Sequence, residues 1–317
     1  MSKPRYLAVG PGGVKGFYML GALHKLWSEG LLDEIEGYAG SSVGAMIVLL
    51  LNCGYAPHEI MLMASKINLF MDFFNVSLGE RLAEMKTNFG ITSNSGIRHA
   101  LETAVIRRYG RVVSMEELYQ STGCDLYITT QNISSGYPVY LSHNTHPDLD
   151  VVTAVLLSTN IPFLFYRMLF HGEIYIDGGF CDPIPIHPFD DGRKTVVAIY
   201  VKTNHPVSTE DPFLKTMTGY VHKMLMTSIH RLAESIIANS STSCHFMEIS
   251  ASGIDTTGLS NTIEDKAKMI VEGLEVASLY VDRLRSGDLE FIPDLTFSSA
   301  IIRESRTINR VTKIKTT

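Results

Sequence analysis

Ser42 is the central residue of the segment GSSVG, residues 40–44, which has the pattern G-x-S-x-G. A short extended stretch precedes this segment, and an apolar run from Ala45 to Leu51 follows it. A serine between two glycines can occupy a sharp turn from strand to helix, where its hydroxyl stands clear of the backbone. Such a turn also puts the oxygen at a helix N-terminus, whose free N–H groups favour a developing anion. The segment therefore predicts a serine nucleophile.

A second glycine-rich segment, GPGGVKG at residues 10–16, follows the first predicted strand and is called the Gly-rich loop below. It is not a P-loop, because Lys15 is followed by Gly16 and not by Ser or Thr. It also fits the dinucleotide fingerprint poorly. Because glycine lets the backbone approach a substrate closely, the N–H groups of Gly12 and Gly13 can hold an oxyanion. A plain tight turn is the alternative interpretation.

The base that would take the serine proton is harder to identify. The chain has eleven histidines, and none of them lies in a recognisable motif. Asp177, followed by Gly178 and Gly179, is a better candidate, because a carboxylate at a strand end with glycines behind it leaves room for a close partner. The dipeptide Asp-Gly also marks ordinary turns, so the residues alone leave the base open.

The order of predicted elements indicates an α/β fold. Strand 6–9, the Gly-rich loop, a helix ending before Gly30, strand 37–40 and the helix after Ser42 form one βαβ unit. Such a unit predicts a parallel sheet covered by helices. Further helices are predicted at 96–108, 114–119, 149–157, 213–238 and 263–284, hairpins at 125–131 with 137–142 and at 163–170 with 173–176, and strands at 195–201 and 246–249.

Methionine and phenylalanine crowd residues 57–90. Methionine adapts to irregular apolar partners, so this region is either a pair of core helices or a mobile apolar lid near an acyl-chain entrance. The sequence does not choose between them.

Composition excludes several classes of protein. The 317 residues are enough for one large domain or two. A formal net charge of −6 argues against nucleic acid as the main partner. The four cysteines are scattered, which is typical of reduced thiols. Acidic residues and histidines do not cluster at ligand spacing, so we expect no metal and no other cofactor. The first residues do not resemble a signal peptide, and the apolar run after Ser42 is too short to span a bilayer, so we expect a cytoplasmic protein.

Three segments together resemble the signature blocks of patatin-like phospholipases, and they occur in the order of that family. The resemblance covers roughly residues 5–202, and residues 158–163 and 182–185 add weaker support. The chain departs from the family at Pro11, which has no N–H to donate, and at Asp182, where the family often has asparagine. The three blocks are Gly12-Gly13-Val14-Lys15-Gly16, Gly40-Ser41-Ser42-Val43-Gly44 and Asp177-Gly178-Gly179.

The resemblance implies a three-layer α/β/α fold with a mostly parallel sheet, helices on both faces and a helical C-terminal extension. We expect a catalytic core at residues 1–205 and a mainly helical part at residues 206–317, packed on the same domain. Lipid is the expected substrate, reached at a membrane or lipid-droplet surface that the protein visits transiently.

The resemblance also implies a catalytic dyad without histidine, in which Ser42 attacks the ester carbonyl of a lipid and Asp177 takes its proton. Gly12, Gly13 and Val43 would hold the oxyanion, and Lys15 would be structural or steer anionic head groups. Because an aspartate with the usual pKa of about 3.9 is a weak base at neutral pH, we expect burial to raise the pKa of Asp177. The apolar neighbours expected to bury it are Ile174, Ile176 and Phe180.

Three other functions stay open at this point. An α/β-hydrolase would use a Ser-His-Asp triad, but in that fold several strands normally precede the serine, and few residues precede Ser42. An inactive relative would bind lipid without cleaving it. An acyltransferase would pass the same acyl-enzyme to an alcohol and not to water. The sequence does not identify the lipid head group or the acyl position.

Overall fold

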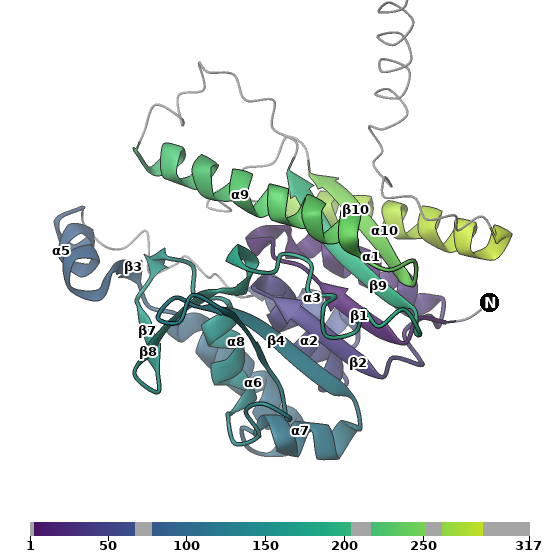
Figure 1. Cartoon of the computed structure of the whole chain (residues 1–317), viewed down its shortest axis with the longest axis horizontal. Helices are drawn as coiled ribbons and strands as arrows, with labels where there is room; N and C mark the ends of the chain where they lie inside the picture. Colours follow the sequence, from purple (N-terminus) through teal and green to yellow (C-terminus); the bar gives the residue numbers. More distant parts are fainter. Residues whose placement is uncertain (1–2, 67–77, 204–216, 252–261, 288–317) are drawn as a thin grey trace, which may run out of the picture.

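Figure 1 shows the computed structural model of the chain, which describes residues 3–66, 78–203, 217–251 and 262–287. Its centre is an eight-stranded sheet in the order β10-β9-β1-β2-β4-β8-β7, with β5 also paired to β4. The strands are β1 (Tyr6–Val9), β2 (Gly37–Ser41), β4 (Asp125–Asn132), β5 (Pro138–Leu141), β7 (Met168–Phe170), β8 (Glu173–Asp177), β9 (Val196–Thr203) and β10 (Cys244–Ala251).

The sheet is parallel over β10, β9, β1, β2 and β4, and antiparallel where β5, β8 and β7 join it. The mostly parallel sheet predicted from the sequence is therefore confirmed. Parallel strands require crossover connections, and the helices that make them cover the sheet. These connecting helices bring the carboxyl ends of β1, β2, β4 and β9 to one edge of the sheet.

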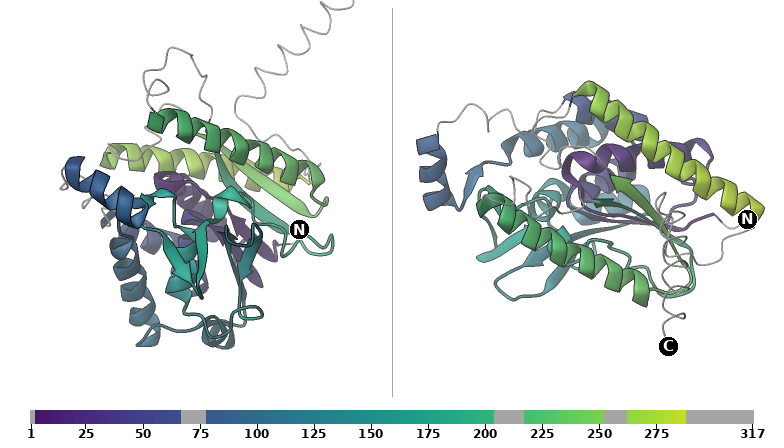
Figure 2. Two further views of the ribbon diagram at one scale, coloured as in Figure 1. Left: turned by 60° about the vertical axis from the view of Figure 1, so that its left-hand side comes forward. Right: turned by 90° about the horizontal axis from the view of Figure 1, so that it is seen from above.

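Helices cover both faces of the sheet, as predicted (Figure 2). On one face, buried side chains of α1, α2, α3, α6, α8 and α10 form the larger core with β1 and β4. On the other face, α9 and residues 184–189 form a smaller core. The helices are α1 (Gly16–Ser28), α2 (Val43–Asn52), α3 (Pro57–Lys66), α5 (Leu78–Asn88), α6 (Ser95–Tyr109), α7 (Met115–Thr122), α8 (Val151–Ser158), α9 (Met217–Asn239) and α10 (Ile263–Ser286).

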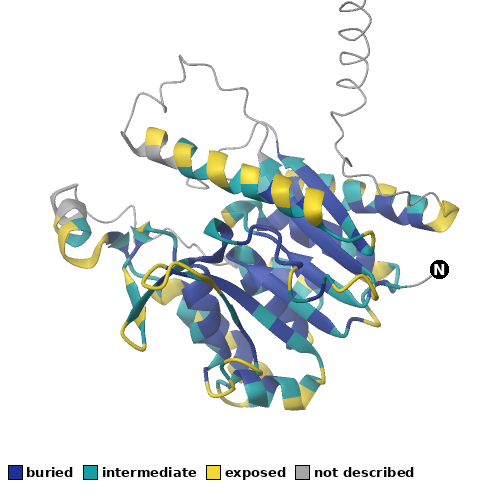
Figure 3. Ribbon diagram, viewed as in Figure 1, coloured by how far each residue is buried: buried dark blue, intermediate teal, exposed yellow. Residues whose placement is uncertain are grey.

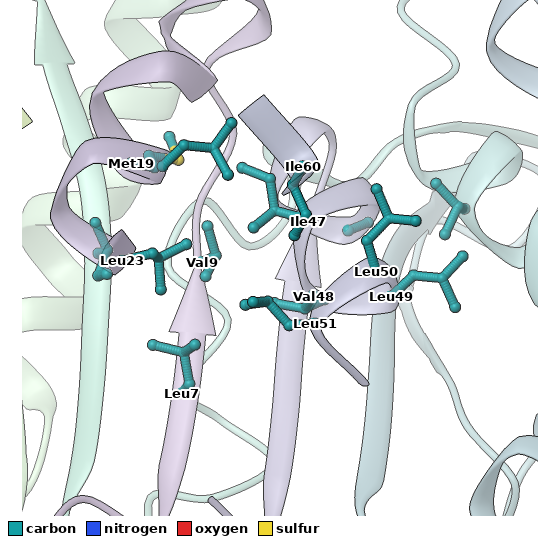
Figure 4. Close-up of a cluster of buried hydrophobic side chains, with 14 of the residues drawn as sticks. Leu7, Val9, Met19, Leu23, Ile47, Val48, Leu49, Leu50, Leu51 and Ile60 are labelled. Atoms are coloured by element: carbon teal, nitrogen blue, oxygen red, sulfur yellow. The ribbon is translucent and has the colours of Figure 1, made fainter. Parts of the chain in front are cut away.

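Strand β1 shows how one short strand serves both cores. Leu7 and Val9 belong to the larger core, whereas Ala8 belongs to the smaller one, because successive side chains of a strand point to opposite faces. Figure 4 shows Val9 between Met19 of α1 and Ile47 of α2. Burial on both faces explains why most residues of the central strands β1 and β2 are buried (Figure 3), while the outer side of α9 is exposed.

The C-terminal helix α10 packs directly on α1 through two glycines. A Cβ atom on Gly21 would lie 2.1 Å from the carbonyl oxygen of Ile270, and one on Gly273 would lie 1.9 Å from that of Tyr18. Larger residues would therefore push the helices apart. The predicted boundary between residues 205 and 206 falls outside the described residues.

Two strand predictions need correction. The apolar run 163–170 is not one strand but two, β6 (Phe163–Phe165) and β7, because the N–H groups of Tyr166 and Arg167 turn to the carbonyl oxygens of Thr92 and Asn88. Strand β6 pairs with β3 (Gly90–Thr92) in a separate two-stranded sheet. The strand predicted at 246–249 is longer, because β10 pairs with β9 along all eight of its residues.

The methionine-rich region contains α3, α5 and β3. Ile60 of α3 is buried in the larger core, whereas Leu62 is 61% exposed. Residues 67–77 lie outside the described part of the chain. The mobile lid therefore stays a prediction.

Candidate active site

Ser42 occupies a sharp turn between β2 and α2, as the G-x-S-x-G segment predicts. Its φ of 58° and ψ of −127° are rare for a residue with a side chain, and such strain is common at functional sites. Both flanking glycines are required by close packing. A Cβ atom on Gly40 would lie 2.5 Å from Cγ2 of Val48, and one on Gly44 would lie 2.1 Å from the carbonyl oxygen of Val9.

Strand β4 brings the serine and the aspartate together. Strand β2 runs parallel to β4 and ends with Ser41 opposite Thr129. Strand β8 runs antiparallel to β4 and ends with Asp177 opposite Thr130. The two strands therefore approach from opposite directions and end at neighbouring residues of β4. A carboxylate can reach the serine across this junction although the two residues are 135 positions apart in the chain.

The Ser42 hydroxyl donates a hydrogen bond of 2.5 Å to Oδ2 of Asp177. Both side chains are buried, with 5% of Ser42 and 4% of Asp177 exposed. The other carboxylate oxygen, Oδ1, accepts a 2.8 Å hydrogen bond from the N–H of Gly179. Burial raises the pKa of Asp177 to about 7, although the hydrogen bonds from Ser42 and Gly179 act in the opposite direction. The expected upward shift is therefore confirmed, with burial as its cause.

The Gly-rich loop lies between the serine turn and the short helix η2 (Gly178–Phe180). A Cβ atom on Gly16 would lie 3.0 Å from Cγ2 of Val43, and one on Gly179 would lie 3.0 Å from the ring of Pro11. Gly12 caps a 3-10 helix, η1 (Gly13–Lys15), in which Val14 packs partly against the larger core. Burial lowers the pKa of Lys15 to about 8.

Backbone donors are available around the serine. Within the described part of the chain, the N–H groups of Gly12 and Gly13 have no hydrogen-bond acceptor. Gly13 has a φ of 54°, which glycine adopts without strain, and nothing lies within 4 Å of the place where a Cβ would be. The first hydrogen bond inside α2 runs from the N–H of Ala45 to the carbonyl oxygen of Ser42. The N–H of Val43 lies before this bond, in the first turn, where backbone N–H groups have no partner within the helix. These donors can stabilise an anion.

Residues 158–160 fix both candidate residues through contacts that the sequence does not predict. The Ser158 hydroxyl accepts a 2.9 Å hydrogen bond from the N–H of Ser42. The carbonyl oxygen of Asn160 accepts a 3.0 Å hydrogen bond from the N–H of Asp177. The hydroxyl of Thr130 donates to the carbonyl oxygens of Leu157, at 3.1 Å, and Ile176, at 2.9 Å. The only signal in the sequence is the resemblance of residues 158–163 to the family.

Asp182 stands where the family often has asparagine, yet its contacts are well defined. Its N–H donates to the carbonyl oxygen of Gly178, and its Oδ2 accepts a 2.7 Å hydrogen bond from the Tyr140 hydroxyl. Burial raises the pKa of Asp182 to about 7. The residue borders a cavity of about 300 Å³ next to α9, and its side chain accepts its hydrogen bond from Tyr140, whereas the Ser42 hydroxyl donates to Asp177. Asp182 is therefore separate from the serine–aspartate pair.

Histidine is not part of this arrangement in the described residues. None of the histidines whose side chains are described hydrogen-bonds to Ser42 or Asp177. In the same part of the chain, no group of three or more histidine, cysteine, aspartate or glutamate side chains could hold a metal ion. Nor does any helix described here have the length and apolar character needed to cross a membrane.

Comparison with solved structures supports the fold. The crystal structure of VipD from Legionella pneumophila superposes with a TM-score of 0.53 at 15% sequence identity, covering 89% of this chain and 67% of VipD. At this identity the similarity establishes the architecture alone.

Comparison of sequences identifies the family. A probable lipid hydrolase, 463L of Invertebrate iridescent virus 6, is 29% identical over 189 residues, which are 58% of this chain and 63% of the viral protein. The mouse 1-acylglycerol-3-phosphate O-acyltransferase Pnpla3 is 27% identical over 179 residues, 55% of this chain and 39% of the mouse protein. The chain thus spans less than two thirds of either relative. The profile of patatin-like phospholipases matches residues 7–190, which include Ser42, Asp177 and the Gly-rich loop, and the chain belongs to this family.

Proposed function

We propose that this protein is a lipid acyl hydrolase that cleaves carboxylic esters through an acyl-enzyme on Ser42, with Asp177 as the base. The observation that carries the proposal is the 2.5 Å hydrogen bond from the Ser42 hydroxyl to the buried Asp177 carboxylate. A serine nucleophile needs a base within hydrogen-bond reach, and this carboxylate is in reach. Membership of the patatin-like family supports a lipid substrate.

In the acylation step, Oγ of Ser42 forms a bond to the ester carbonyl carbon while its proton passes to Oδ2 of Asp177. The carbonyl oxygen becomes an oxyanion in the tetrahedral intermediate. When the intermediate collapses, the bond to the leaving alcohol breaks, and Asp177 returns the proton to the alcohol oxygen. A carboxylate with a pKa of about 7 suits both directions of transfer, because the ideal catalytic pKa lies near the working pH.

The oxyanion is stabilised by the N–H groups of Gly12, Gly13 and Val43. The unused donors of the Gly-rich loop and the N-terminus of α2 support this assignment. Donors held rigidly in a water-poor site act strongly on a developing charge, and removal of one typically costs about 3 kcal/mol of barrier.

In the deacylation step, Asp177 takes a proton from the incoming acceptor, whose oxygen forms a bond to the acyl carbon. The bond from that carbon to Oγ of Ser42 then breaks, and Asp177 returns the proton to Oγ, which restores the serine hydroxyl and the carboxylate. Water as acceptor gives hydrolysis, and an alcohol gives acyl transfer. One relative is named a probable lipid hydrolase and another an acyltransferase, so both outcomes have a precedent among related proteins.

The proposal is tested by labelling with a fluorophosphonate probe and by hydrolysis of an acyl ester. Wild-type protein should react with the probe and release fatty acid, Ser42→Ala should do neither, and Asp177→Asn should hydrolyse at least about 10³-fold more slowly. Labelling that persists in Ser42→Ala would exclude this nucleophile. A wild-type protein that binds lipid without labelling or turnover would favour the non-catalytic lipid-binding relative.

A Ser-His-Asp triad would need an imidazole beside the serine. In the described residues the Ser42 hydroxyl donates its hydrogen bond to Asp177, which favours the dyad. Replacing each histidine in turn is the decisive experiment, because a single inactive variant would favour the triad.

A further inference from the structure

Strand β7 stops short of the end of β8 that carries Asp177. It pairs with β8 only as far as Met168, which lies opposite Tyr175. The chain before Met168 turns away to β3, where the N–H of Tyr166 bonds to the carbonyl oxygen of Thr92. Strand β7 therefore offers no partner to the backbone of the buried Asp177. Buried backbone groups need hydrogen-bond partners, so another part of the chain must supply one.

Asn160 makes the two bonds that a neighbouring strand would make at this edge. Its carbonyl oxygen accepts a 3.0 Å hydrogen bond from the N–H of Asp177, and its Nδ2 donates a 3.0 Å bond to the carbonyl oxygen of Tyr175. Backbone groups alternate between the two edges of a strand, so those of Tyr175 and Asp177 share one edge of β8. The side-chain amide of Asn160 thus stands in for the backbone N–H of a strand.

Helix α8 brings Asn160 to this edge. The helix packs on β4 and β8 (Figure 1) and ends at Ser158, two residues before Asn160. Asn160 is 2% exposed, so its position is fixed by packing as well as by hydrogen bonds. On the other edge of β8, the Thr130 hydroxyl donates to the carbonyl oxygen of Ile176. The end of β8 that carries the candidate base is therefore held on both edges.

An asparagine at this position is not explained by stability. Its Oδ1 is buried and has no hydrogen-bond partner among the described residues. A buried acceptor without a donor lowers the free energy of unfolding, by at least as much as one hydrogen bond raises it. An apolar side chain would avoid this penalty, so the unpartnered oxygen needs another explanation. The donor on the same amide, which holds β8 beside Asp177, supplies one.

We propose that Asn160 is a positioning residue, which keeps the Asp177 carboxylate within hydrogen-bond reach of Ser42 by standing in for a strand at the edge of β8. This inference rests on the proposed hydrolase function and adds a residue to it. Asn160 acts through the backbone of β8. Because a small displacement of a catalytic group lowers the rate of the chemical step, kcat should depend on Asn160, whereas KM should not.

Asn160→Ala tests this, because it removes the side-chain donor together with the unpartnered Oδ1 and keeps the backbone carbonyl. For hydrolysis of an acyl ester, kcat should fall about ten- to a hundredfold, with KM within about twofold of the wild-type value. The midpoint of urea unfolding should change little, because a hydrogen bond and an unpaired acceptor are lost together. Asn160→Ser, which keeps a short donor, should recover part of the lost rate.

Asn132→Ala is the matched control, because Asn132 is another buried asparagine and holds the opposite end of β8. Its Nδ2 donates a 2.8 Å bond to Oε2 of Glu173, and its Oδ1 accepts from the N–H groups of Ser134 and Ser135. This variant should lower the urea midpoint more than Asn160→Ala does and leave kcat near the wild-type value. Equal losses of kcat in the two variants, or a wild-type kcat in Asn160→Ala, would overturn the proposal.

A second measurement separates failure of this proposal from failure of the hydrolase function, because it needs no ester cleavage. Exchange of the backbone N–H of Asp177 with solvent is followed by NMR in the full chain carrying Ser42→Ala. Adding Asn160→Ala should speed this exchange by at least about tenfold, whereas adding Asn132→Ala should not. Faster exchange with Asn160→Ala alone supports the proposal even if no ester is cleaved. Unchanged exchange, or equal acceleration by both substitutions, overturns it even if esters are hydrolysed.

Discussion

The hydroxyl of Ser158 holds the backbone of Ser42, whose N–H donates to it over 2.9 Å. Ser158 is fully buried and is the last residue of α8. Two residues later, the Asn160 carbonyl holds the N–H of Asp177. One short segment thus contacts both members of the proposed dyad, so the spacing between them depends on α8 as well as on the sheet.

Ser158→Ala should therefore lower kcat by about ten- to a hundredfold with little change in KM, because a small misplacement of the nucleophile is costly. It should also lower the free energy of unfolding by about 1–3 kcal/mol, since the Ser42 N–H stays buried without an acceptor. Steady-state kinetics and urea unfolding measure the two effects.

The matched control is Ser142→Ala, which removes another fully buried hydroxyl, one that lies 3.2 Å from Oγ1 of Thr145. It should leave kcat near the wild-type value, and Ser158→Cys should recover part of the lost rate. Equal losses of kcat in the two alanine variants would show that Ser158 has no positioning role.

The rate of ester cleavage should depend on the ionisation of Asp177. The carboxylate must be charged to accept the serine proton, and burial raises its pKa to about 7. The value of kcat/KM should therefore fall about tenfold per pH unit below this pKa and level off above it. A profile measured from pH 5 to 9 on a neutral ester checks this, and a limb near pH 4 would contradict a buried base.

The raised pKa values also affect stability. Between the usual aspartate pKa of about 3.9 and the folded value of about 7, the folded protein holds a proton that the unfolded chain releases. The free energy of unfolding should therefore fall as the pH rises through this window. Asp182, whose pKa is also raised to about 7, acts in the same direction.

Asp177→Asn removes one of these two buried charges. At pH 8 the free energy of unfolding of the variant should exceed that of wild type by about 1–4 kcal/mol. At pH 4 this difference should vanish. Chemical unfolding at both pH values measures this. If the difference in unfolding free energy between Asp177→Asn and wild type were the same at both pH values, burial would not destabilise the charged carboxylate.

Ser42 and Asp177 could be picked out as candidates because their geometry is local, although only the resemblance to the family assigned Asp177 as the base. A turn as sharp as that of Ser42 requires small neighbours, and the close approach of β4 to η2 requires Gly178. Each of these two requirements therefore produces a glycine pattern in the sequence. The contact of Ser158 with Ser42 spans 116 positions and leaves no such pattern. It follows from how α8 packs against the sheet, which a single sequence does not specify.

The same distinction explains the strand errors. Residues 163–170 read as one strand because the whole run is rich in apolar residues. The break after Phe165 depends on strand β3, because β6 pairs with β3 in a separate sheet and the N–H of Tyr166 donates to the carbonyl oxygen of Thr92. Only β7 then joins the main sheet. Likewise, the sequence predicts a short strand in the region of β10, and the parallel pairing with β9 makes the observed strand longer. Long-range pairing decides both cases, and local propensity does not report it.

The close approach of Gly178 to β4 gives a last prediction. A Cβ atom there would lie 2.0 Å from the carbonyl oxygen of Thr129, so Gly178→Ala must displace the backbone next to Asp177. We expect it to cost about 1–3 kcal/mol of unfolding free energy and most of the activity. Gly96→Ala is the control, because nothing lies within 4 Å of its added Cβ, and alanine favours the helix α6 in which it lies. If Gly178→Ala proved as active and stable as Gly96→Ala, the packing that joins Asp177 to β4 could not be as tight as the structure requires.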